Sequence, residues 1–394
     1  MQNKFQIPHG WTSSTLSKEC EIKIGGTPRR NVPEYWNGDN PWVSIADMNK
    51  DIIVDTKEKI TDIGVTNSNV KLISQGTILL SFKLTIGKAV KAGIDLYTNE
   101  AITALEIKNH DRLFEDYLMY FLRWFDIKQY AHDAAKGKSL NSTTLASIPI
   151  YFPEIQKQQK IVEILKTISL IKQKRNHTRI VSKKLISSIF TKIFGNPELN
   201  PKNWPKKQIQ EIADVGTGGT PRRSVEEYYS GTIPWVKTAE AQDNIILKTE
   251  EGLTQLGLEN SNARIFPIGT ILVAMYGQGK TRGKTAKLGI PAATNQAFAA
   301  ILPSKNHETD YLWHFLQNSY NFLRKMARGG NQPNLNLGMI KSLQIPLPSL
   351  KLQQEFSYFA KKYAKLNTKL KNSEARFMAL SSSLTEKAFR GELV

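Results

Sequence analysis

The hexapeptide Gly25-Gly26-Thr27-Pro28-Arg29-Arg30 occurs a second time, unchanged, as Gly218-Gly219-Thr220-Pro221-Arg222-Arg223, 193 positions later. Further matches at the same spacing extend the repeat in both directions: Pro8 and Pro201, Trp11 and Trp204, Tyr35 and Tyr228, Pro41–Val43 and Pro234–Val236, and Gly76–Leu79 and Gly269–Leu272. A single six-residue match can arise by chance, but a ladder of matches at one spacing indicates a duplicated architecture. Two copies cover about 8–200 and 201–394.

The copies differ in the length of their loops. The spacing grows to 196 between Gly87-Lys88 and Gly283-Lys284, so the second copy carries extra residues within 276–282 (YGQGKTR). It settles at 195 for Gln158-Gln159 and Gln353-Gln354. A shared framework with different loops predicts two related modules that bind different targets.

Each copy begins with a mixed part and ends with a long helix. Short β-rich runs such as 76–82 (GTILLSF) alternate with turn residues, and helical patterns occupy 112–130 and 309–327. Helices start after Pro153 and Pro348, because proline suits a helix start but not its interior. The sequence predicts an α+β protein with mixed α/β domains at 1–153 and 197–347, and with long helices at 154–196 and 348–394.

The two helices share an apolar spacing of four and three residues, which is typical of a coiled coil. Its positions are Ile164, Ile168, Ile171, Arg175, Thr178, Ser182, Leu185, Ile189 and Ile193 in the first helix, and Leu352, Phe356, Phe359, Tyr363, Leu366, Leu370, Ser373, Phe377, Leu380 and Leu384 in the second. With Ile164 opposite Leu384 in an antiparallel pair, Arg175 falls opposite Ser373, and these two residues mark the register. The alternative is two separate amphipathic helices that pack on their own domains. Against it, ~30–40 residues form ~45–60 Å of helix, too long for one domain.

Composition narrows the class of protein. The chain has 394 residues, is 40% hydrophobic, and contains no apolar stretch long enough to span a membrane. Its first residues do not resemble a signal peptide, so a cytoplasmic location is expected. A single cysteine, Cys20, and six scattered histidines argue against a disulfide framework or a metalloenzyme.

The charge favours a polyanionic partner. The chain has 54 Lys and Arg against 35 Asp and Glu, a net charge of +19. Segment 154–196 holds 10 of these cations against 2 anions, and segment 348–394 holds 9 against 4, so the helices carry 13 of the excess charges. A phosphate backbone or an acidic partner fits such helices, although a solvated lysine-rich face explains part of the charge.

Two apparent catalytic motifs fail on inspection. Segment 277–285 (GQGKTRGKT) lacks the glycine that a P-loop needs five residues before Gly-Lys-Thr, where Ala274 and Gln278 stand. Asp95, Glu106 and Lys108 have the spacing of a Mg²⁺-dependent nuclease, but the second copy has Pro291, Leu302 and Ser304 at these positions. Neither motif predicts catalysis.

Binding residues remain. The two Gly-Gly pairs suggest tight turns, and the arginines that follow suit phosphates or guanine edges, although the motif could be only a structural turn. Basic and amide side chains also gather in the loops that differ between the copies. The predicted DNA-binding residues are Arg29, Arg30, Lys83, Lys88, Lys136, Lys138, Arg222, Arg223, Gln278, Lys280, Arg282, Arg328, Asn331 and Gln332. Trp42 and Trp235 are expected in the core.

Taken together, these motifs resemble a known family. Duplicated modules with Gly-Gly-Thr-Pro, a Gly-Thr-Ile-Leu strand, a Thr-Asn-Gln/Glu-Ala segment (98–101 and 294–297) and an Ile-Pro-x-Pro run before a Gln-Gln helix are similar to the specificity subunit of type I restriction–modification systems. The resemblance covers the full length. Glu100 departs from it, because the second copy has the more typical Gln296.

The resemblance implies a non-catalytic scaffold for double-stranded DNA. Each target recognition domain would read one half of a bipartite, asymmetric site, and an antiparallel coiled coil would set the spacing. The implied partners are two adenine-methylating modification subunits, which bind S-adenosylmethionine, and ATP- and Mg²⁺-dependent restriction subunits. This chain itself would bind no cofactor or metal and no membrane. A stand-alone sequence-specific nuclease and a duplicated DNA-binding regulator without enzyme partners remain as alternatives.

Overall fold

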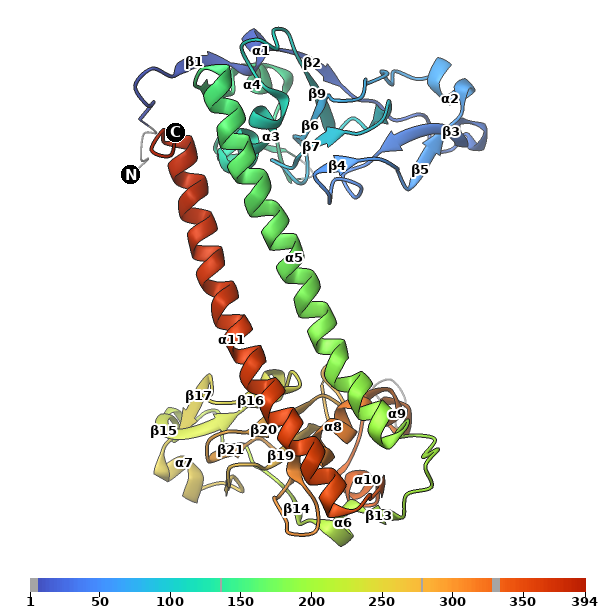
Figure 1. Cartoon of the computed structure of the whole chain (residues 1–394), viewed down its shortest axis with the longest axis vertical. Helices are drawn as coiled ribbons and strands as arrows, with labels where there is room; N and C mark the ends of the chain where they lie inside the picture. The colour runs from blue at the N-terminus through green and yellow to red at the C-terminus, as the bar shows by residue number, and fades with distance from the viewer. Residues whose placement is uncertain (1–5, 135–136, 278, 328–333) are drawn as a thin grey trace. The chain divides into compact units, whose positions relative to one another are not determined.

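A computed structural model of the chain describes residues 6–134, 137–277, 279–327 and 334–394. They belong to two compact units, the first made of Met1–Arg175 and Glu374–Val394 and the second of Asn176–Ser373. Each boundary lies within a long helix, so each unit contains a piece of both long helices (Figure 1). The fold is α+β, as the sequence predicted.

The first unit contains many short strands. They are β1 (Thr12–Thr15), β2 (Cys20–Ile24), β3 (Trp36–Val43), β4 (Ile52–Ile53), β5 (Glu58–Ile60), β6 (Ile78–Ser81), β7 (Ala89–Ala92), β8 (Tyr97–Thr98), β9 (Ile102–Ile107), β10 (His132–Ala134), β11 (Gly137–Ser139) and β12 (Pro149–Phe152). Its short helices are α1 (Leu16–Glu19), η1 (Pro33–Tyr35), α2 (Asp62–Thr66), α3 (Glu115–Trp124), η2 (Ile127–Tyr130) and α4 (Ser142–Ser147). The main sheet has the order β2-β9-β6-β7-β4, and a smaller sheet has the order β5-β3-β8.

The main sheet is buried on both faces, which explains the unbroken apolar run of β6. Ile78 and Leu80 pack in the cluster that contains α3, whereas Leu79 packs in a cluster with Val43 of β3 and Ile53 of β4. Successive side chains of a strand point to opposite faces, so a strand covered on both faces must be apolar throughout. The predicted strand at 76–82 and helix at 112–130 are confirmed as β6, α3 and η2.

The second unit repeats this plan. Its strands are β13 (Lys206–Gln208), β14 (Val215–Thr217), β15 (Tyr229–Val236), β16 (Asn244–Ile246), β17 (Glu251–Leu253), β18 (Ile265–Phe266), β19 (Ile271–Ala274), β20 (Thr285–Leu288), β21 (Ala292–Thr294), β22 (Phe298–Ile301) and β23 (Gln344–Pro346). Its short helices are α6 (Ile209–Ile212), η3 (Glu226–Tyr228), η4 (Thr238–Glu240), α7 (Gln255–Glu259), α8 (Thr309–Asn318), α9 (Tyr320–Met326) and α10 (Leu337–Lys341). The order β14-β22-β19-β20-β16 matches the main sheet of the first unit strand for strand.

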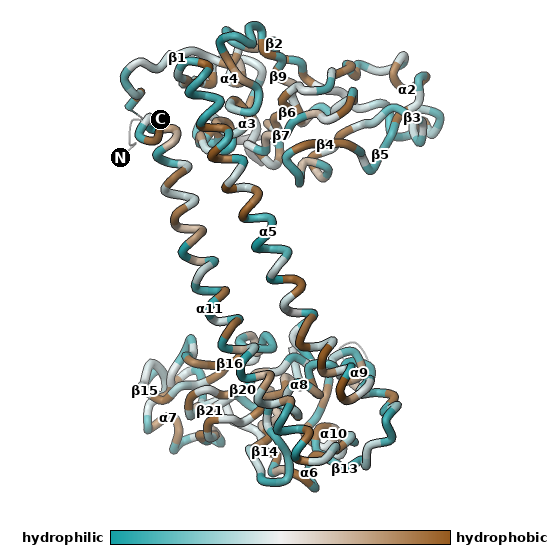
Figure 2. The backbone as a smooth tube through the Cα atoms, viewed as in Figure 1, coloured by the Kyte–Doolittle hydropathy of each residue, from teal (hydrophilic) through white to brown (hydrophobic). Residues whose placement is uncertain are grey.

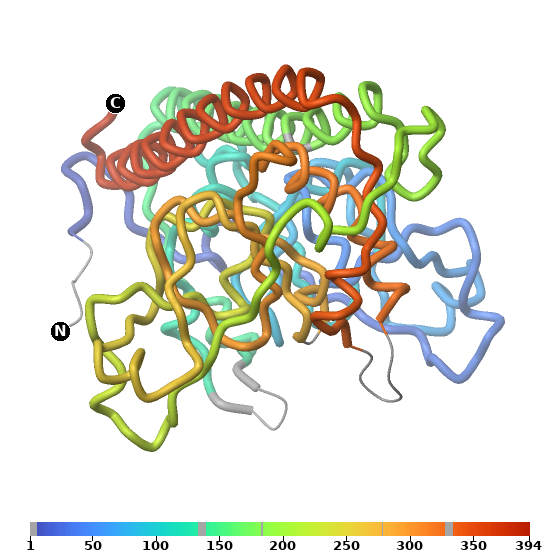
Figure 3. The backbone as a smooth tube through the Cα atoms, turned by 90° about the horizontal axis from the view of Figure 1, so that it is seen from below, coloured from blue at the N-terminus to red at the C-terminus, as the bar shows by residue number. Residues whose placement is uncertain are grey.

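Two long helices of 40 residues each, α5 (Ile155–Phe194) and α11 (Leu350–Phe389), begin just after the prolines that predicted them. In the first unit, Ile161 and Leu165 of α5 share a core with Phe389 at the end of α11. In the second unit, Phe190 near the end of α5 packs edge-on against Phe356 near the start of α11, with ring centroids 5.4 Å apart. The helices therefore run antiparallel, and within each unit their segments lie side by side (Figures 1 and 3).

The predicted apolar seam is wrong in detail. Leu185, Leu366 and Leu380 are about half exposed. The hydroxyl of Ser182, a predicted seam residue, donates hydrogen bonds to Tyr363 at 3.3 Å and to Asn367, which is not a seam residue, at 2.9 Å. A straight helix has 3.6 residues per turn, so a stripe spaced at 3.5 residues drifts away from its partner. Hydrophobic and hydrophilic residues alternate along the middle of both helices (Figure 2).

Candidate nucleic-acid interface

The two repeated motifs of each module meet in space. In the first module the Thr27 hydroxyl donates a hydrogen bond to the Glu100 carboxylate, and in the second the Thr220 hydroxyl donates to the Gln296 side-chain oxygen. Glu100 therefore fills the role of Gln296, because either side chain offers an oxygen that accepts the threonine hydrogen bond.

The paired glycines are needed because neighbouring backbone lies too close to leave room for a side chain, and not because the chain turns there. A Cβ on Gly218 would lie 1.9 Å from the Thr294 carbonyl oxygen, and one on Gly25 would lie 2.3 Å from the Asn99 carbonyl oxygen. These glycines do not have a positive φ. The expectation that they free the backbone for a tight turn is therefore wrong: they allow the end of β2 or β14 to lie against the end of β8 or β21.

Trp42 and Trp235 are core residues, as predicted. Each is 1% exposed, and each indole N–H donates to the carbonyl of the second glycine, Gly26 at 3.0 Å and Gly219 at 3.1 Å. The tryptophan thereby fastens the Gly-Gly-Thr-Pro segment to the small sheet of its module.

The two arginines of each motif have different surroundings. Arg30 forms an ion pair with Glu58, and its guanidinium lies 3.9 Å from the Trp36 ring centroid. Arg223 pairs with Glu251 at 2.8 Å and lies 4.5 Å from the Tyr229 ring. Hydrogen bonds from Lys237 and Arg223 hold the pKa of Glu251 below its usual value, so this carboxylate stays charged.

All four arginines are exposed, but the ion pairs and ring contacts of the described residues involve Arg30 and Arg223 rather than the preceding Arg29 and Arg222. A guanidinium already engaged by a carboxylate and an aromatic ring is less available to DNA than one without these contacts. Within the predicted pairs, Arg29 and Arg222 are therefore the stronger candidates for phosphate contact.

The hairpin loops carry further candidates. Strands β6 and β7 are antiparallel, as are β19 and β20, so the variable loop of each module joins the two strands of a hairpin. In the first module, Lys83 and Lys88 are half-buried, and the Lys88 ammonium donates to the Ile45 carbonyl at 3.4 Å. In the second, Lys280 is exposed and Arg282 is half-buried.

Several predicted DNA contacts lie outside the described residues, namely Lys136, Gln278, Arg328, Asn331 and Gln332. Lys138 belongs to β11, but its side chain is also outside the described part. These residues stay predictions.

The register markers lie at the unit boundaries. Arg175 ends the α5 segment of the first unit, where its guanidinium lies 4.9 Å from the Phe377 ring, and Ser373 ends the α11 segment of the second. Their pairing stays a prediction.

The residues that resembled a nuclease site each serve the fold. Asp95 accepts a hydrogen bond from the Gln75 backbone at 2.8 Å, Glu106 pairs with Lys23 at 2.5 Å, and the Lys108 ammonium donates to the Ser17 carbonyl at 2.6 Å. Among the described residues, moreover, no group of three His, Cys, Asp or Glu side chains is arranged to hold a metal. None of the described helices has the length and apolarity to cross a membrane.

A Lys–Asp–Lys cluster around a buried aspartate escaped sequence reasoning. Asp116 of α3 binds Lys91 of β7 at 2.9 Å and Lys166 of α5 at 2.5 Å. The second module repeats it, with Asp310 of α8 paired to Lys287 of β20 and 4.0 Å from Lys361 of α11. The cluster ties sheet, short helix and long helix together in each module, and an alignment of the two copies would have revealed it.

Comparison with known proteins agrees with this architecture. The family described as type I restriction modification DNA specificity domain matches residues 8–179 and 201–375. The MjaIX specificity subunit of a type I restriction enzyme from Methanocaldococcus jannaschii is 24% identical over 98% of this chain and 94% of its own length.

Two solved structures share the fold over nearly the whole chain. The crystal structure of a type I restriction–modification S subunit from M. genitalium has a TM-score of 0.60 at 15% identity, covering 99% of this chain and 97% of that one. A chain from a study of complex assembly and conformational transition in a type I R-M system has a TM-score of 0.64 at 17% identity, covering 99% and 100%. With two family matches placed on two modules of one plan, the chain belongs to the type I restriction–modification DNA specificity family.

Proposed function

We propose that this chain is the non-catalytic, DNA-reading subunit of a type I restriction–modification complex. Its first module would read one half of a bipartite, asymmetric site in double-stranded DNA, and its second module the other half. Helices α5 and α11 would set the spacing between the halves. We place the complex in the cytoplasm, because cellular DNA is its proposed ligand.

One observation carries the proposal: the main sheets of the two modules match strand for strand, but the modules differ in their exposed loops. The β19–β20 loop is longer than the β6–β7 loop, and Asp243 stands where the first module has Lys50. Because direct readout depends on which side chains reach the base edges, such loops suit two different half-sites.

The long helices also support docking of partner proteins. Exposed apolar side chains lie on the α5 and α11 segments of each unit: Leu170, Ile171, Met378 and Leu380 in the first, and Ile180, Val181, Leu185, Leu366 and Leu370 in the second. Apolar surface of this kind marks protein contacts. We propose two modification subunits as the partners, with restriction subunits joining them. S-adenosylmethionine would bind to the former and ATP with Mg²⁺ to the latter, and this chain would bind no cofactor.

Methylation profiling tests the proposal directly. DNA from a host that expresses this chain with its modification partner should carry methylated adenines in one bipartite sequence. Exchanging residues 197–347 for the same region of a relative should change one half of that sequence only. If both halves change together, the two-reader model is wrong.

The alternatives have their own tests. Cleavage of DNA by the purified chain with Mg²⁺ alone would support the stand-alone nuclease and contradict the proposal. Discrimination of a DNA site without any methylating partner encoded nearby would support the regulator.

A further inference from the structure

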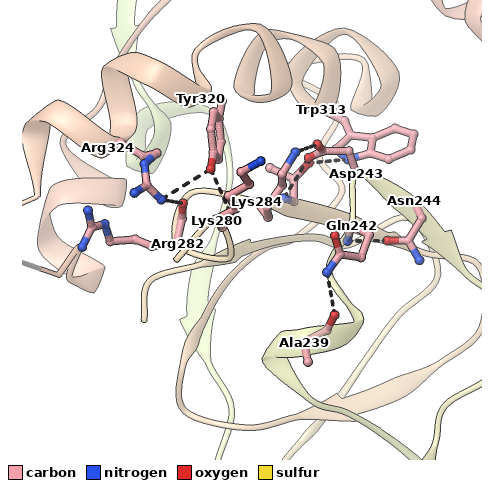
Figure 4. A network of polar contacts seen from close by, with 11 residues as sticks. Ala239, Gln242, Asp243, Asn244, Lys280, Arg282, Lys284, Trp313, Tyr320 and Arg324 are labelled. Carbon is pink, nitrogen blue, oxygen red and sulfur yellow. Dashed lines mark hydrogen bonds and ion pairs between the residues drawn. The ribbon is translucent and has the colours of Figure 1, made fainter. Parts of the chain in front are cut away.

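In the second module, helix α9 holds the backbone of segment 279–284, the end of the β19–β20 loop. The Tyr320 hydroxyl donates to the Lys280 carbonyl at 2.8 Å. One guanidinium nitrogen of Arg324 lies 2.9 Å from the Gly279 carbonyl oxygen. The same nitrogen lies 3.3 Å from the Arg282 carbonyl oxygen (Figure 4). Three carbonyls of the loop are thus turned toward a single helix.

The base of the same loop is fixed by a second set of contacts. Lys284 forms an ion pair with Asp243, and its ammonium lies 4.7 Å from the Tyr320 ring. Asp243 also accepts hydrogen bonds from the Thr285 backbone at 3.2 Å and hydroxyl at 3.1 Å, and the Trp313 indole N–H donates to that hydroxyl at 3.0 Å. The network joins the segment before β16 to the hairpin (Figure 4).

The segment before β16 is ordered from within as well. The Gln242 backbone N–H donates to the Asn244 side chain at 2.8 Å, and the Gln242 side chain donates to the Ala239 carbonyl at 2.9 Å. Two neighbouring loops of the second module are therefore held by one polar network.

The first module has a different arrangement at these positions. Lys50 replaces Asp243, Ala89 replaces Thr285 and Met119 replaces Trp313. The short helix η2 follows α3 where α9 follows α8 in the second module. The network therefore belongs to the second module and is not required by the shared framework.

We propose that Tyr320 and Arg324 are positioning residues that hold segment 279–284 in the conformation that reads the second half-site. This inference rests on the proposed function. Both side chains bind backbone carbonyls of the loop, whereas the Lys280 side chain, which they leave exposed, is the group offered to DNA. When only a fraction of the protein is competent to bind, the measured dissociation constant rises by the inverse of that fraction. Loosening the loop therefore weakens specific binding even though no contact to DNA is removed.

Binding to two duplexes tests the inference. The complex of this chain with its modification partner is titrated with a duplex containing its methylation site and with one of equal length lacking it. Arg324→Ala removes charge-assisted hydrogen bonds, so the Kd for the site should rise about tenfold to a hundredfold. Binding to the second duplex should not change. Lys325→Ala, which removes the same charge from the exposed next residue, should change neither Kd.

A variant without a charge change separates positioning from phosphate contact. Tyr320→Phe removes only the hydroxyl, and its Kd for the site should rise about two- to tenfold. If Arg324 instead contacts phosphate, Arg324→Ala weakens binding to both duplexes and lowers the salt dependence by about one ion. That result would overturn the inference.

Hydrogen exchange and methylation profiling complete the test. Amide exchange in 279–284 should quicken in Arg324→Ala and Tyr320→Phe but stay unchanged in 82–88, and the methylated sequence should become degenerate in the second half only. Unchanged exchange and unchanged specificity in both variants would refute the positioning role. A wild-type complex that does not distinguish the two duplexes would instead refute the proposed function.

Discussion

The side-chain oxygen of Gln158 accepts a hydrogen bond from the backbone N–H of Phe114 at 2.8 Å, which fastens the first turn of α5 to the start of α3. Its amide nitrogen donates to the carbonyls of Arg112 and Pro153, both at 2.8 Å. Gln353 repeats the pattern at the start of α11, accepting from the Glu308 N–H at 3.0 Å and donating to the Pro348 carbonyl at 2.7 Å. The first glutamine of the repeated Gln-Gln motif thus joins the long helix to its domain by hydrogen bonds.

Gln158→Ala should lower the free energy of unfolding of the first unit by about 2–4 kcal/mol. Three hydrogen bonds are lost and buried backbone groups are left without partners, each at a cost of about 1–3 kcal/mol. Gln159→Ala is the matched control, because the next side chain is exposed. Scanning calorimetry measures both variants, and equal losses of stability in the two would show that Gln158 does not stabilise this contact.

Asp116 should make the first unit sensitive to strong acid. Burial raises the pKa of this carboxyl, but hydrogen bonds from Lys166 and Lys91 outweigh burial, so the net pKa lies below its ordinary value of 3.8. As the pH falls, Asp116 is therefore protonated in the unfolded chain before it is protonated in the folded unit. Stability from the cluster is complete above about pH 4 and is lost as the pH falls through the folded-state pKa.

Asp116→Asn should cost about 1–3 kcal/mol at pH 7, less than the ~3–5 kcal/mol of a fully buried pair because Lys166 is half exposed. It should also flatten the dependence of stability on pH below 4. Asp111→Asn, at an exposed carboxylate nearby in the sequence, should leave both unchanged. Urea unfolding at several pH values gives the comparison.

Much of the fold could be predicted from the sequence because the relevant signals are local or periodic. The β6 run, the prolines before α5 and α11, and the duplication itself each need only neighbouring residues or a constant spacing. The duplication also predicted that both modules would place Trp42 and Trp235 in equivalent core positions.

The remainder depends on partners that are distant in the sequence. Gly25 lies against Asn99, Asp116 forms ion pairs with Lys91 and Lys166, and Arg30 forms one with Glu58. No local sequence pattern specifies such contacts. The seam failed for another reason: a straight helix has 3.6 residues per turn, so positions spaced at 3.5 residues drift away from the partner helix, and Leu366 and Leu380 are exposed. The sequence also does not distinguish Arg29 from Arg30, because the difference between them is the ion pair of Arg30 with Glu58, 28 residues away.

His314 should make the second unit sensitive to mild acid. Burial lowers its pKa from 6.5 to about 4, although the charge of neighbouring Asp310 opposes this and that of Lys287 adds to it. Its ring packs edge-on against Phe356 of α11, with centroids 5.4 Å apart. Between pH 6.5 and 4, His314 is protonated in the unfolded chain but neutral in the folded unit. The stability of the second unit is therefore unaffected by His314 above pH 6.5 and falls as the pH drops below that value.

The loss attributable to His314 approaches about 3 kcal/mol at pH 4. His314→Tyr, which installs the residue of the equivalent position Tyr120, should remove most of this dependence. His307 accounts for part of the remaining pH dependence, because burial lowers its pKa as well. In calorimetry from pH 7 to 4.5, the transition of the second unit should move and that of the first should not. A variant as acid-sensitive as the wild type would contradict the assignment to His314.

Arg222 and Arg223 should separate DNA binding from stability, although they are adjacent. Arg222→Ala removes an exposed cation and should weaken DNA binding at every sequence, lowering the salt dependence by about one ion with stability unchanged within ~0.5 kcal/mol. Arg223→Ala removes the ion pair with Glu251 and the stacking on Tyr229. It should therefore lower stability by about 1 kcal/mol, a modest cost because the arginine side chain is 53% exposed. Salt titrations of DNA affinity and urea unfolding of the same two variants provide the measurements. If Arg222→Ala instead lost affinity at one base pair only, Arg222 would be reading a guanine edge, and if it lost none, the motif would serve only the fold of its module.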